Sequence, residues 1–381
     1  MRGSGRQVRH PLGYRYFVPD PLPPTLECTL SLMKALSEAD CRIGRLAGEG
    51  RRLPNPHVLV RPFVRREAVD SSRIEGTQAT LGELLAAEAG AAVERSAGEL
   101  REVGNYVLAL ETGIRGAGKA GVSLRSVKLL HRILMTGSHG AHVTPGRFRE
   151  SQNWIGPPLS RLQTATYVPP ALAEMRECLR AWEGFLKDRA YPPLIRVALL
   201  HYQFEAIHPF LDGNGRVGRL LVILLLVQWG ILPAPLLYLS AFFEATRPAY
   251  YSRLRGVSEE GDWTAWLRYF LKGVEIQAED AVRRSERIDS LLRRWREGAG
   301  LGVDLELIDL VAANPFVSVN RAARRLGVAF TTAQRAVERL RKRSILQEVS
   351  AARRNRVYCA KALLAVLEEP PRIPENLSDL I

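Results

Sequence analysis

Apolar residues recur at the spacing of an α-helix in almost every extended segment of this chain, and this periodicity limits the possible folds more than any other feature. Runs with strand character are short and occur in two places, in the middle of the chain and near its C-terminal end. The expected helices cover residues 25–47, 58–75, 81–87, 98–114, 124–135, 170–186, 193–207, 217–229, 248–254 and 263–296. The sequence therefore predicts a mainly α protein built around a helical bundle.

Segments of different character follow one another along the 381 residues, which are too many for one compact core of ordinary size. Gly298, Gly300 and Gly302 are typical of a linker and set off a C-terminal unit. The expected segments are a proline-rich N-terminal segment at 1–24, an N-terminal helical region at 25–90, a helical core at 91–297, a C-terminal unit at 304–367 and a tail at 368–381.

The longest apolar run, residues 220–227, falls far short of the roughly 20 residues that a membrane-spanning helix needs. Residues 1–24 contain arginines and prolines but no apolar stretch that would serve as a secretory signal. The cysteines are scattered, without the close pairs of a zinc site or the density of a disulfide scaffold. We therefore expect a cytoplasmic protein that does not cross a membrane.

A long segment without helical periodicity lies at residues 139–169 and is rich in proline and glycine. It contains two short extended stretches, at 149–155 and 166–168. Irregular loops of this length are uncommon inside compact domains, so we expect the segment to be functional or mobile.

One helix of the core ends in a loop whose residues suit a bound phosphate. Pro209 disfavours the helical conformation at the residue before it, so His208 stands at a helix end and faces the loop. Gly213, Asn214 and Gly215 tolerate positive φ angles and leave backbone N–H groups unshielded. These groups open the next helix, whose positive end attracts anions. A phosphate chain is the ligand that we expect there.

Arg216 and Arg219 lie on one face of that next helix, close to its start, and both can reach an anion bound at the loop. Two cations near a helix N-terminus are unfavourable for the helix itself, so a ligand explains them better than a structural role does. Asp212 adds a hard carboxylate oxygen, which suits Mg²⁺ completed by phosphate oxygens and water. The loop therefore predicts a nucleotide phosphate site with a histidine base beside it.

Residues 208–219 read HPFLDGNGRVGR, and they resemble the signature HPFx(D/E)GNGRxxR of the Fic family of protein adenylyltransferases at every specified position. Residues 144–170 are similar to the flap hairpin of that family, and residues 25–85 to its N-terminal helical region. The resemblance implies a Fic-type helical bundle with a small β-hairpin flap. It also implies transfer of AMP from ATP, with Mg²⁺, to a Ser, Thr or Tyr hydroxyl of target proteins and of the chain itself.

The resemblance implies roles for individual residues as well. His208 would take the proton from the attacking hydroxyl, and Asp212 would hold the metal. Ile155 and Gly156 of the flap would hold the target segment in extended form. Tyr250 either lies against the nucleotide or packs in the core, as aromatic residues at helical spacing often do. The residues that bind ATP and its phosphates, through backbone, amide and guanidinium donors, would be Gly213, Asn214, Gly215, Arg216, Val217, Gly218 and Arg219.

Residues 71–76 read SSRIEG and resemble the inhibitory motif (S/T)xxxE(G/N) of the family, with Ser71 and Glu75 one helical turn apart. In family members of this type the glutamate pairs with the second arginine of the signature, here Arg219, and fills the space that the γ phosphate needs. The alternative is a surface glutamate in front of Gly76, which ends the helix.

The C-terminal unit is expected to contain helices at 304–313, 319–326 and 331–342, followed by a hairpin of 345–349 with 356–360. It resembles the winged helix-turn-helix domain that is appended to many Fic proteins. Its basic residues are Arg335, Arg339, Arg341, Lys342, Arg343, Arg353, Arg354 and Arg356. Together with the net charge of +14, they indicate contact with DNA. The alternative is a unit for dimerisation or target recruitment whose arginines lie on a solvated face.

Two further functions fit the same residues. The first is removal of AMP from modified proteins, with Glu75 orienting a water molecule for phosphodiester cleavage. The second is a DNA-binding regulator without enzymatic activity, in which the core senses a nucleotide.

Overall fold

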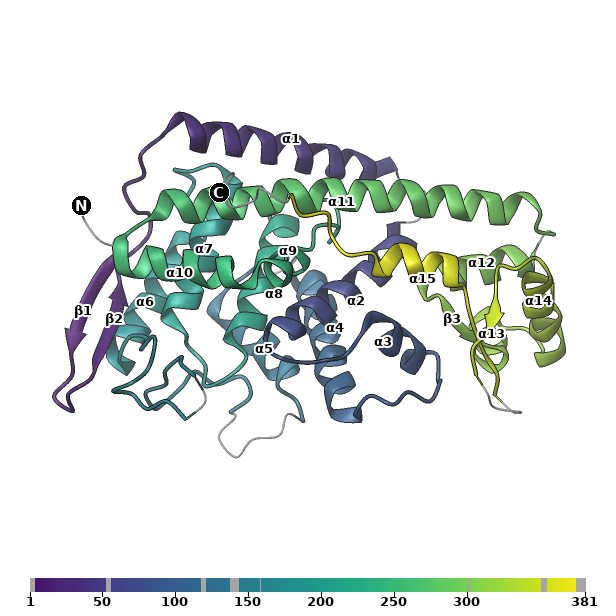
Figure 1. Ribbon diagram of the computed structural model, residues 1–381, viewed down its shortest axis with the longest axis horizontal. Coiled ribbons are helices and arrows are strands. Elements are labelled where there is room, and N and C mark those ends of the chain that lie inside the picture. The colour runs from purple at the N-terminus through teal and green to yellow at the C-terminus, as the bar shows by residue number, and fades with distance from the viewer. Residues whose placement is uncertain are drawn as a thin grey trace.

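The protein is described from a computed structural model, which covers residues 4–52, 56–117, 121–137, 144–157, 159–300, 302–350 and 355–374. Figure 1 shows a helical bundle lying under the long helix α11, with a small β-hairpin at one end and the C-terminal unit at the other. The helices are α1 (Leu30–Arg52), α2 (Pro56–Ile74), α3 (Leu81–Glu88), α4 (Ala97–Ala117), α5 (Leu124–Leu134), α6 (Leu172–Phe185), α7 (Pro193–Ile207), α8 (Asn214–Gln228), α9 (Ser240–Ala245), α10 (Arg247–Glu260), α11 (Trp263–Glu297), α12 (Val303–Ala313), α13 (Val319–Leu326), α14 (Phe330–Lys342) and α15 (Lys361–Glu368). The prediction of a mainly α protein is confirmed.

Helices α7 and α8 form the centre of the bundle, and nearly all of their side chains are buried. Both helices carry apolar residues around most of their circumference, which is typical of a helix enclosed by protein. Burying each Leu, Ile or Val side chain contributes about 1.5–3 kcal/mol, so this pair is a firm support for the loop between them. Helix α8 begins at Asn214, earlier than the predicted start at 217, because Gly213 adopts a left-handed conformation and caps it.

Helix α1 lies along α11 across the top of the bundle in Figure 1. Ala39, Ile43 and Leu46 of α1 are buried in the main core. Two ion pairs cross the same contact, Arg42 with Glu279 and Arg45 with Glu286, but their side chains are exposed. Exposed ion pairs contribute little, so the apolar contact holds the two helices together. None of the described helices is long and apolar enough to cross a lipid bilayer.

The N-terminal segment contains a hairpin that the sequence analysis missed. Strand β1 (Gly5–Arg9) pairs antiparallel with β2 (Arg15–Pro19), and Gly13 makes the turn with φ of +87°. The Phe17 N–H donates to the Val168 carbonyl at 2.9 Å, so β2 is attached to the end of the flap. Val168 lies about 150 residues from Phe17 along the chain, and local sequence does not reveal such a contact.

The flap has less β structure than predicted. Its two expected strands, 149–155 and 166–168, meet only at one antiparallel bridge between Ile155 and Tyr167. The two residues exchange backbone hydrogen bonds of 2.8 and 3.0 Å, and the Tyr167 hydroxyl donates to the Ala206 carbonyl of α7 at 2.8 Å. The prolines of this segment remove backbone donors, which explains why the ladder does not extend. Residues 139–143 and 158 of the predicted loop lie outside the described part of the chain.

The C-terminal unit combines α12–α15 with a small antiparallel sheet. The sheet has the order β3 (Phe316–Ser318), β5 (Val357–Cys359), β4 (Gln347–Glu348). The expected hairpin is therefore present as β4 and β5, whereas β3 and α15 were not predicted. Gly327, with φ of +65°, forms the turn between α13 and α14. Arg353 and Arg354, which the sequence analysis assigned to the basic surface, lie outside the described residues.

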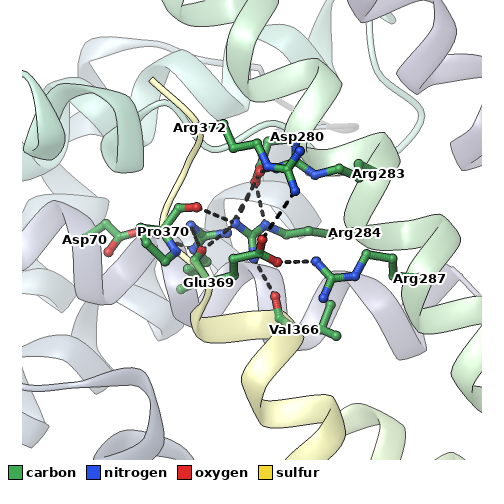
Figure 2. A network of polar contacts seen from close by, with 10 residues as sticks. Asp70, Asp280, Arg283, Arg284, Arg287, Val366, Glu369, Pro370 and Arg372 are labelled. Carbon is green, nitrogen blue, oxygen red and sulfur yellow. Dashed lines mark hydrogen bonds and ion pairs between the residues drawn. The ribbon is translucent and has the colours of Figure 1, made fainter. Parts of the chain in front are cut away.

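The unit is not separated from the core, contrary to what the glycine linker suggested. Figure 2 shows a polar network in which Arg284 of α11, 1% exposed, bonds Asp280 and the backbone carbonyls of Val366 and Glu369. Arg66 of α2 joins this network, donating to the Glu369 carbonyl at 3.0 Å and to Asp280 at 3.4 Å. Buried charge-assisted hydrogen bonds of this kind are strong and directional. The network therefore fixes the end of the C-terminal unit to α11 and to α2, which also carries Ser71.

Candidate active site

The loop from His208 to Gly213 is held by its own backbone and by Asn214. His208 adopts a left-handed conformation, with φ of 48°, in front of Pro209. The Asn214 side chain accepts a hydrogen bond from the Phe210 N–H and donates one to the Phe210 carbonyl, both at 2.8 Å. Asn214 is 2% exposed. Its amide therefore closes the loop with one of its two N–H donors, and its contact with phosphate stays a prediction.

Three residues that the sequence analysis did not assign to the site support the loop from outside. Arg149 donates from Nε to the His208 carbonyl at 3.1 Å, and its N–H donates to the Pro209 carbonyl at 2.9 Å. Asn153 donates to the Phe210 carbonyl at 2.7 Å. His131 accepts from the Gly146 N–H at Nδ1, so its Nε2 carries the proton and donates to the Asp212 carbonyl at 3.0 Å. The sequence shows arginines at positions 147 and 149, but it does not reveal the contacts that Arg149 makes with the loop.

His208, the predicted base, is held in one tautomer by a backbone carbonyl. Its Nδ1 lies 3.3 Å from the Glu205 carbonyl oxygen. A carbonyl only accepts hydrogen bonds, so Nδ1 carries the proton and Nε2 keeps its lone pair. Burial lowers the pKa of His208 to about 4, since the charged imidazolium is poorly solvated there. The imidazole is therefore neutral at physiological pH, which is the form that accepts a proton.

A cavity of about 620 Å³ opens beside His208, and several predicted residues meet in it. It receives residues from the end of α2, where Glu75 follows the helix, and from the flap, α7, α8 and α10, which are far apart in the sequence. The predicted residues among those that line it are Glu75, Ile155, Gly156, His208, Gly215, Arg219 and Tyr250. The cavity therefore joins the predicted base, the predicted phosphate-binding helix and the flap in one space.

Glu75 and Ser71 both contact Arg219. The Arg219 guanidinium donates to Glu75 Oε1 at 2.6 Å, to Ser71 Oγ at 2.9 Å and to the Ser71 carbonyl at 2.9 Å. Burial by itself would raise the pKa of Glu75, but the Arg219 guanidinium outweighs it and holds that pKa below its usual value. Gly76 has φ of +106°, a backbone conformation that suits glycine, and it lies two residues after the end of α2. The Glu75 carboxylate is therefore ionised and held against Arg219.

The Glu75 carboxylate also lies over the first turn of α8. A Cβ added to Gly215 would stand 2.4 Å from Glu75 Oε1, so only glycine allows this approach. The first N–H groups of a helix lack partners within it and attract a negative charge. The Val217 N–H, in contrast, already donates to the Gly213 carbonyl at 3.0 Å, and the Val217 side chain is buried in the core. Glu75 thus occupies the position where the sequence analysis expected a phosphate.

Arg216 and Tyr250 are less directly placed toward the cavity. Arg216 is 5% exposed, and its guanidinium lies 3.6 Å from Asp212 and 3.7 Å from Glu102. Tyr250 is 1% exposed, bonds His201 Nε2 through its hydroxyl at 2.8 Å, and stacks on Phe243 at 4.5 Å. Tyr250 is therefore a core residue with one side at the cavity, and its contact with a nucleotide stays a prediction.

Glu205, one turn before His208 on α7, was missed by the sequence analysis. It lines the cavity, and its Oε1 is buried without a hydrogen-bond partner among the described residues. Burial raises the pKa of Glu205 to about 7, although the positive charge of Arg219 acts to lower it. A Cβ on Gly218 would lie 2.2 Å from Glu205 Oε1. Gly218 therefore makes room for a carboxyl group, a role that the phosphate-binding assignment did not include.

We expect Gly218→Ala to lower the free energy of unfolding by about 1–2 kcal/mol, because the added methyl group overlaps the Glu205 carboxyl. In a Glu205→Ala background the same substitution should cost less than about 0.5 kcal/mol, since the overlapping atoms are gone. Urea unfolding of the four members of this mutant cycle measures both values. Equal costs in the two backgrounds would show that Glu205 does not set the space at position 218.

Comparison with known proteins gives one consistent family. Residues 33–115 match the family described as Fic/DOC family N-terminal, and residues 121–226 match the Fic/DOC family. A protein adenylyltransferase Fic from Drosophila grimshawi is 29% identical over 210 residues, which are 52% of this chain and 39% of that protein. The protein of the same name from Aedes aegypti is 30% identical over 154 residues, 39% of this chain and 27% of that protein. The matches thus span less than half the length of these relatives.

A solved structure supports the fold. The crystal structure of a Fic family protein from Desulfovibrio desulfuricans G20 has a TM-score of 0.58 with this chain at 22% sequence identity. The likeness covers 89% of this chain and 98% of that one. It therefore extends past the helical bundle and includes most of the chain.

Proposed function

This protein carries the N-terminal domain and the Fic domain of the Fic/DOC family, and on this premise we propose that it is a protein adenylyltransferase. It transfers AMP from ATP to a Ser, Thr or Tyr hydroxyl of target proteins and of itself. The observation that carries the proposal is the common cavity of His208 and the first turn of α8, which Arg219 also lines while it contacts Glu75. A neutral base, a phosphate-binding helix start and a guanidinium in one space suit transfer of a nucleotidyl group.

The proposed reaction balances as one displacement at phosphorus. The target hydroxyl oxygen attacks the α phosphorus, a new P–O bond forms, and the bond from that phosphorus to the pyrophosphate oxygen breaks. Nε2 of His208 takes the hydroxyl proton, and pyrophosphate leaves. The first N–H groups of α8, together with Arg216 and Arg219, balance the negative charge, so most of the acceleration comes from positioning and electrostatics.

Asp212 is the residue that would hold Mg²⁺. Its side chain is 57% exposed, and only Oδ1 is used, accepting from the Gly213 N–H at 2.6 Å. Among the described residues no three His, Cys, Asp or Glu side chains gather as a complete metal site. A single carboxylate with a free oxygen fits Mg²⁺, which commonly takes its other ligands from substrate phosphates and water. When bound, the ion would neutralise charge on the phosphates.

The Glu75 contact supports an inhibited resting state. The carboxylate occupies both the helix start and the Arg219 guanidinium, the two groups that a terminal phosphate of ATP would use. Two anions do not share such a site, because like charges at contact distance repel strongly. ATP therefore binds productively only when Glu75 moves away from Arg219.

Labelled ATP tests the proposal. Incubation of the chain with α-labelled ATP should leave label on protein bands after denaturation, with release of one pyrophosphate per AMP, whereas γ-labelled ATP should leave none. Label from γ-labelled ATP, with none from α-labelled ATP, would indicate transfer of the terminal phosphoryl group instead. Absence of label from a Glu75→Gly variant would favour the alternative function, a nucleotide-sensing, DNA-binding regulator without enzymatic activity. Rapid loss of label from protein modified beforehand would favour removal of AMP.

For the C-terminal unit we propose a winged helix-turn-helix that binds DNA weakly. Several of its arginines are engaged within the protein: Arg339 with Asp304, Arg341 with Glu338, Arg343 with the Trp295 carbonyl, and Arg356 with Glu348. Arg335 and Lys342 are exposed and make no ion pair with a described residue. The charge available to a phosphate backbone is therefore smaller than the sequence suggested.

We expect the full chain to bind duplex DNA with a slope of about −2 in log Kobs against log salt, since about two phosphates would be neutralised. Fluorescence anisotropy of a labelled duplex at several salt concentrations measures this slope. Arg335→Gln should reduce its magnitude by about one. No binding at low salt would contradict the DNA role and favour target recruitment or dimerisation.

A further inference from the structure

A second cavity, of about 710 Å³, lies where the N-terminal helices meet the C-terminal unit. It shares no lining residue with the candidate active site. One wall comes from α2, α3 and α4, and the other from α13. We call it the arginine pocket after the arginines that line it, which are Arg61, Arg65, Arg321, Arg324 and Arg325.

Both acidic residues of the arginine pocket pair with the same arginine. Its two glutamates, Glu88 and Glu111, both face Arg65, at 2.8 and 3.8 Å. Within the described part of the chain, no carboxylate lies within 4.0 Å of the guanidinium groups of the other four. Arg324 donates only to the Asn320 carbonyl, at 3.4 Å. Most of the positive charge in the pocket therefore has no partner from the protein.

The charge on Arg321 is disfavoured by burial and by the neighbouring arginines. Burial lowers its pKa, and although Glu88 acts in the opposite direction, Arg325, Arg65 and Arg61 lower it further. Like charges gathered in a partly enclosed space repel one another, and a structural role would not require them. Guanidinium groups bind phosphate oxygens in a two-pronged geometry, and a bound polyanion would turn this repulsion into attraction.

We propose that the arginine pocket binds a small anion with two or more phosphate groups, such as an oligophosphate. Arg61 of α2 and the arginines of α13 lie on different walls, so one anion that reaches both needs more than one charged group. A DNA backbone fits less well, because Glu88 and Glu111 stand in the pocket and α13 precedes the helix expected to enter a groove. The ligand would join α13 to the helix that carries Ser71.

Calorimetric titration of the full chain with sodium tripolyphosphate tests the pocket. The variant Arg321→Gln/Arg325→Gln removes two charges one helical turn apart. The control Arg176→Gln/Arg180→Gln makes the same change on α6, where both arginines are exposed and outside both cavities. We expect the Kd to rise at least about tenfold in the first variant and to stay within about twofold in the control. Arg219→Ala, which alters only the active site, should keep this binding event.

Three outcomes would overturn the proposal. They are equal affinity in the wild type and the pocket variant, equal weakening in the pocket variant and the control, and binding that disappears with Arg219→Ala alone. Binding of a short DNA duplex that is weakened in the pocket variant, together with absence of tripolyphosphate binding, would also overturn it and would assign the surface to nucleic acid. Thermal unfolding with and without tripolyphosphate confirms that the variants are folded, and the stabilisation should be lost only in the pocket variant. None of these readouts depends on AMP transfer.

Discussion

Replacing His208 with alanine is expected to slow AMP transfer by about 10²- to 10⁴-fold, the usual contribution of a general base. The bond from its Nδ1 to the Glu205 carbonyl leaves Nε2 as the only proton acceptor that the ring offers to a target hydroxyl. ATP affinity should change little, because the helix start and Arg219 are independent of the imidazole. The assay is the initial rate with α-labelled ATP, in a Glu75→Gly background so that the resting contact does not mask the effect.

The pH profile gives an independent check on the same residue. With a pKa of about 4 in the folded protein, His208 is protonated only below that value, so the base form is present throughout the neutral range. Transfer should therefore show no His208-linked change between about pH 6 and pH 8. A rate of His208→Ala within severalfold of its parent, with unchanged thermal unfolding, would exclude His208 as the base.

Glu75→Gly is expected to raise the rate of AMP transfer by about 5- to 30-fold. The contact with Arg219 is short, but the Glu75 side chain is 36% exposed. We therefore assign the closed state, in which Glu75 contacts Arg219, an advantage of about 1–2 kcal/mol. Each 1.4 kcal/mol is a factor of ten in population, which gives the stated range if the closed state dominates beforehand. Self-modification and modification of cell-extract proteins, at saturating ATP and magnesium, measure the gain.

Two further variants test whether the charge of Glu75, and not the size of its side chain, causes the inhibition. Glu75→Gln keeps the size of the side chain and removes its charge, so it should activate, though less than glycine does. Arg219→Glu removes the resting contact and the phosphate contact together and should not activate. Inhibition by Glu75 would be refuted by a folded Glu75→Gly variant whose rate stays within about twofold of the wild type.

Local signals predicted the elements closest to the chemistry. Pro193 at a helix start and Pro209 after His208 fix both ends of α7, whose observed bounds agree with the prediction. The start of α8 was placed too late because Gly213, read as a loop residue, caps the helix. The motif also fixed the pairing of Glu75 with Arg219, but only through the family resemblance. No periodicity would place residues 144 positions apart in contact.

What the sequence did not reveal depends on contacts between distant segments. Arg149 supports the catalytic loop through backbone carbonyls, which carry no sequence signature. The glycines near 300 predicted a separate C-terminal unit, yet Arg66 and Arg284 bind it to the core through groups more than 80 residues away. Burial then decides the strength of each contact, and burial is set by the whole fold.

The close approach of Gly218 to Glu205 has a consequence for how proteins with this site diverge. The two positions cannot change in any order, because a methyl group at 218 collides with a full-length glutamate at 205. A lineage that shortens residue 205 first can later accept alanine or serine at 218, whereas the opposite order passes through a less stable intermediate. We therefore expect the two positions to covary among related chains, with glutamate at one accompanying glycine at the other.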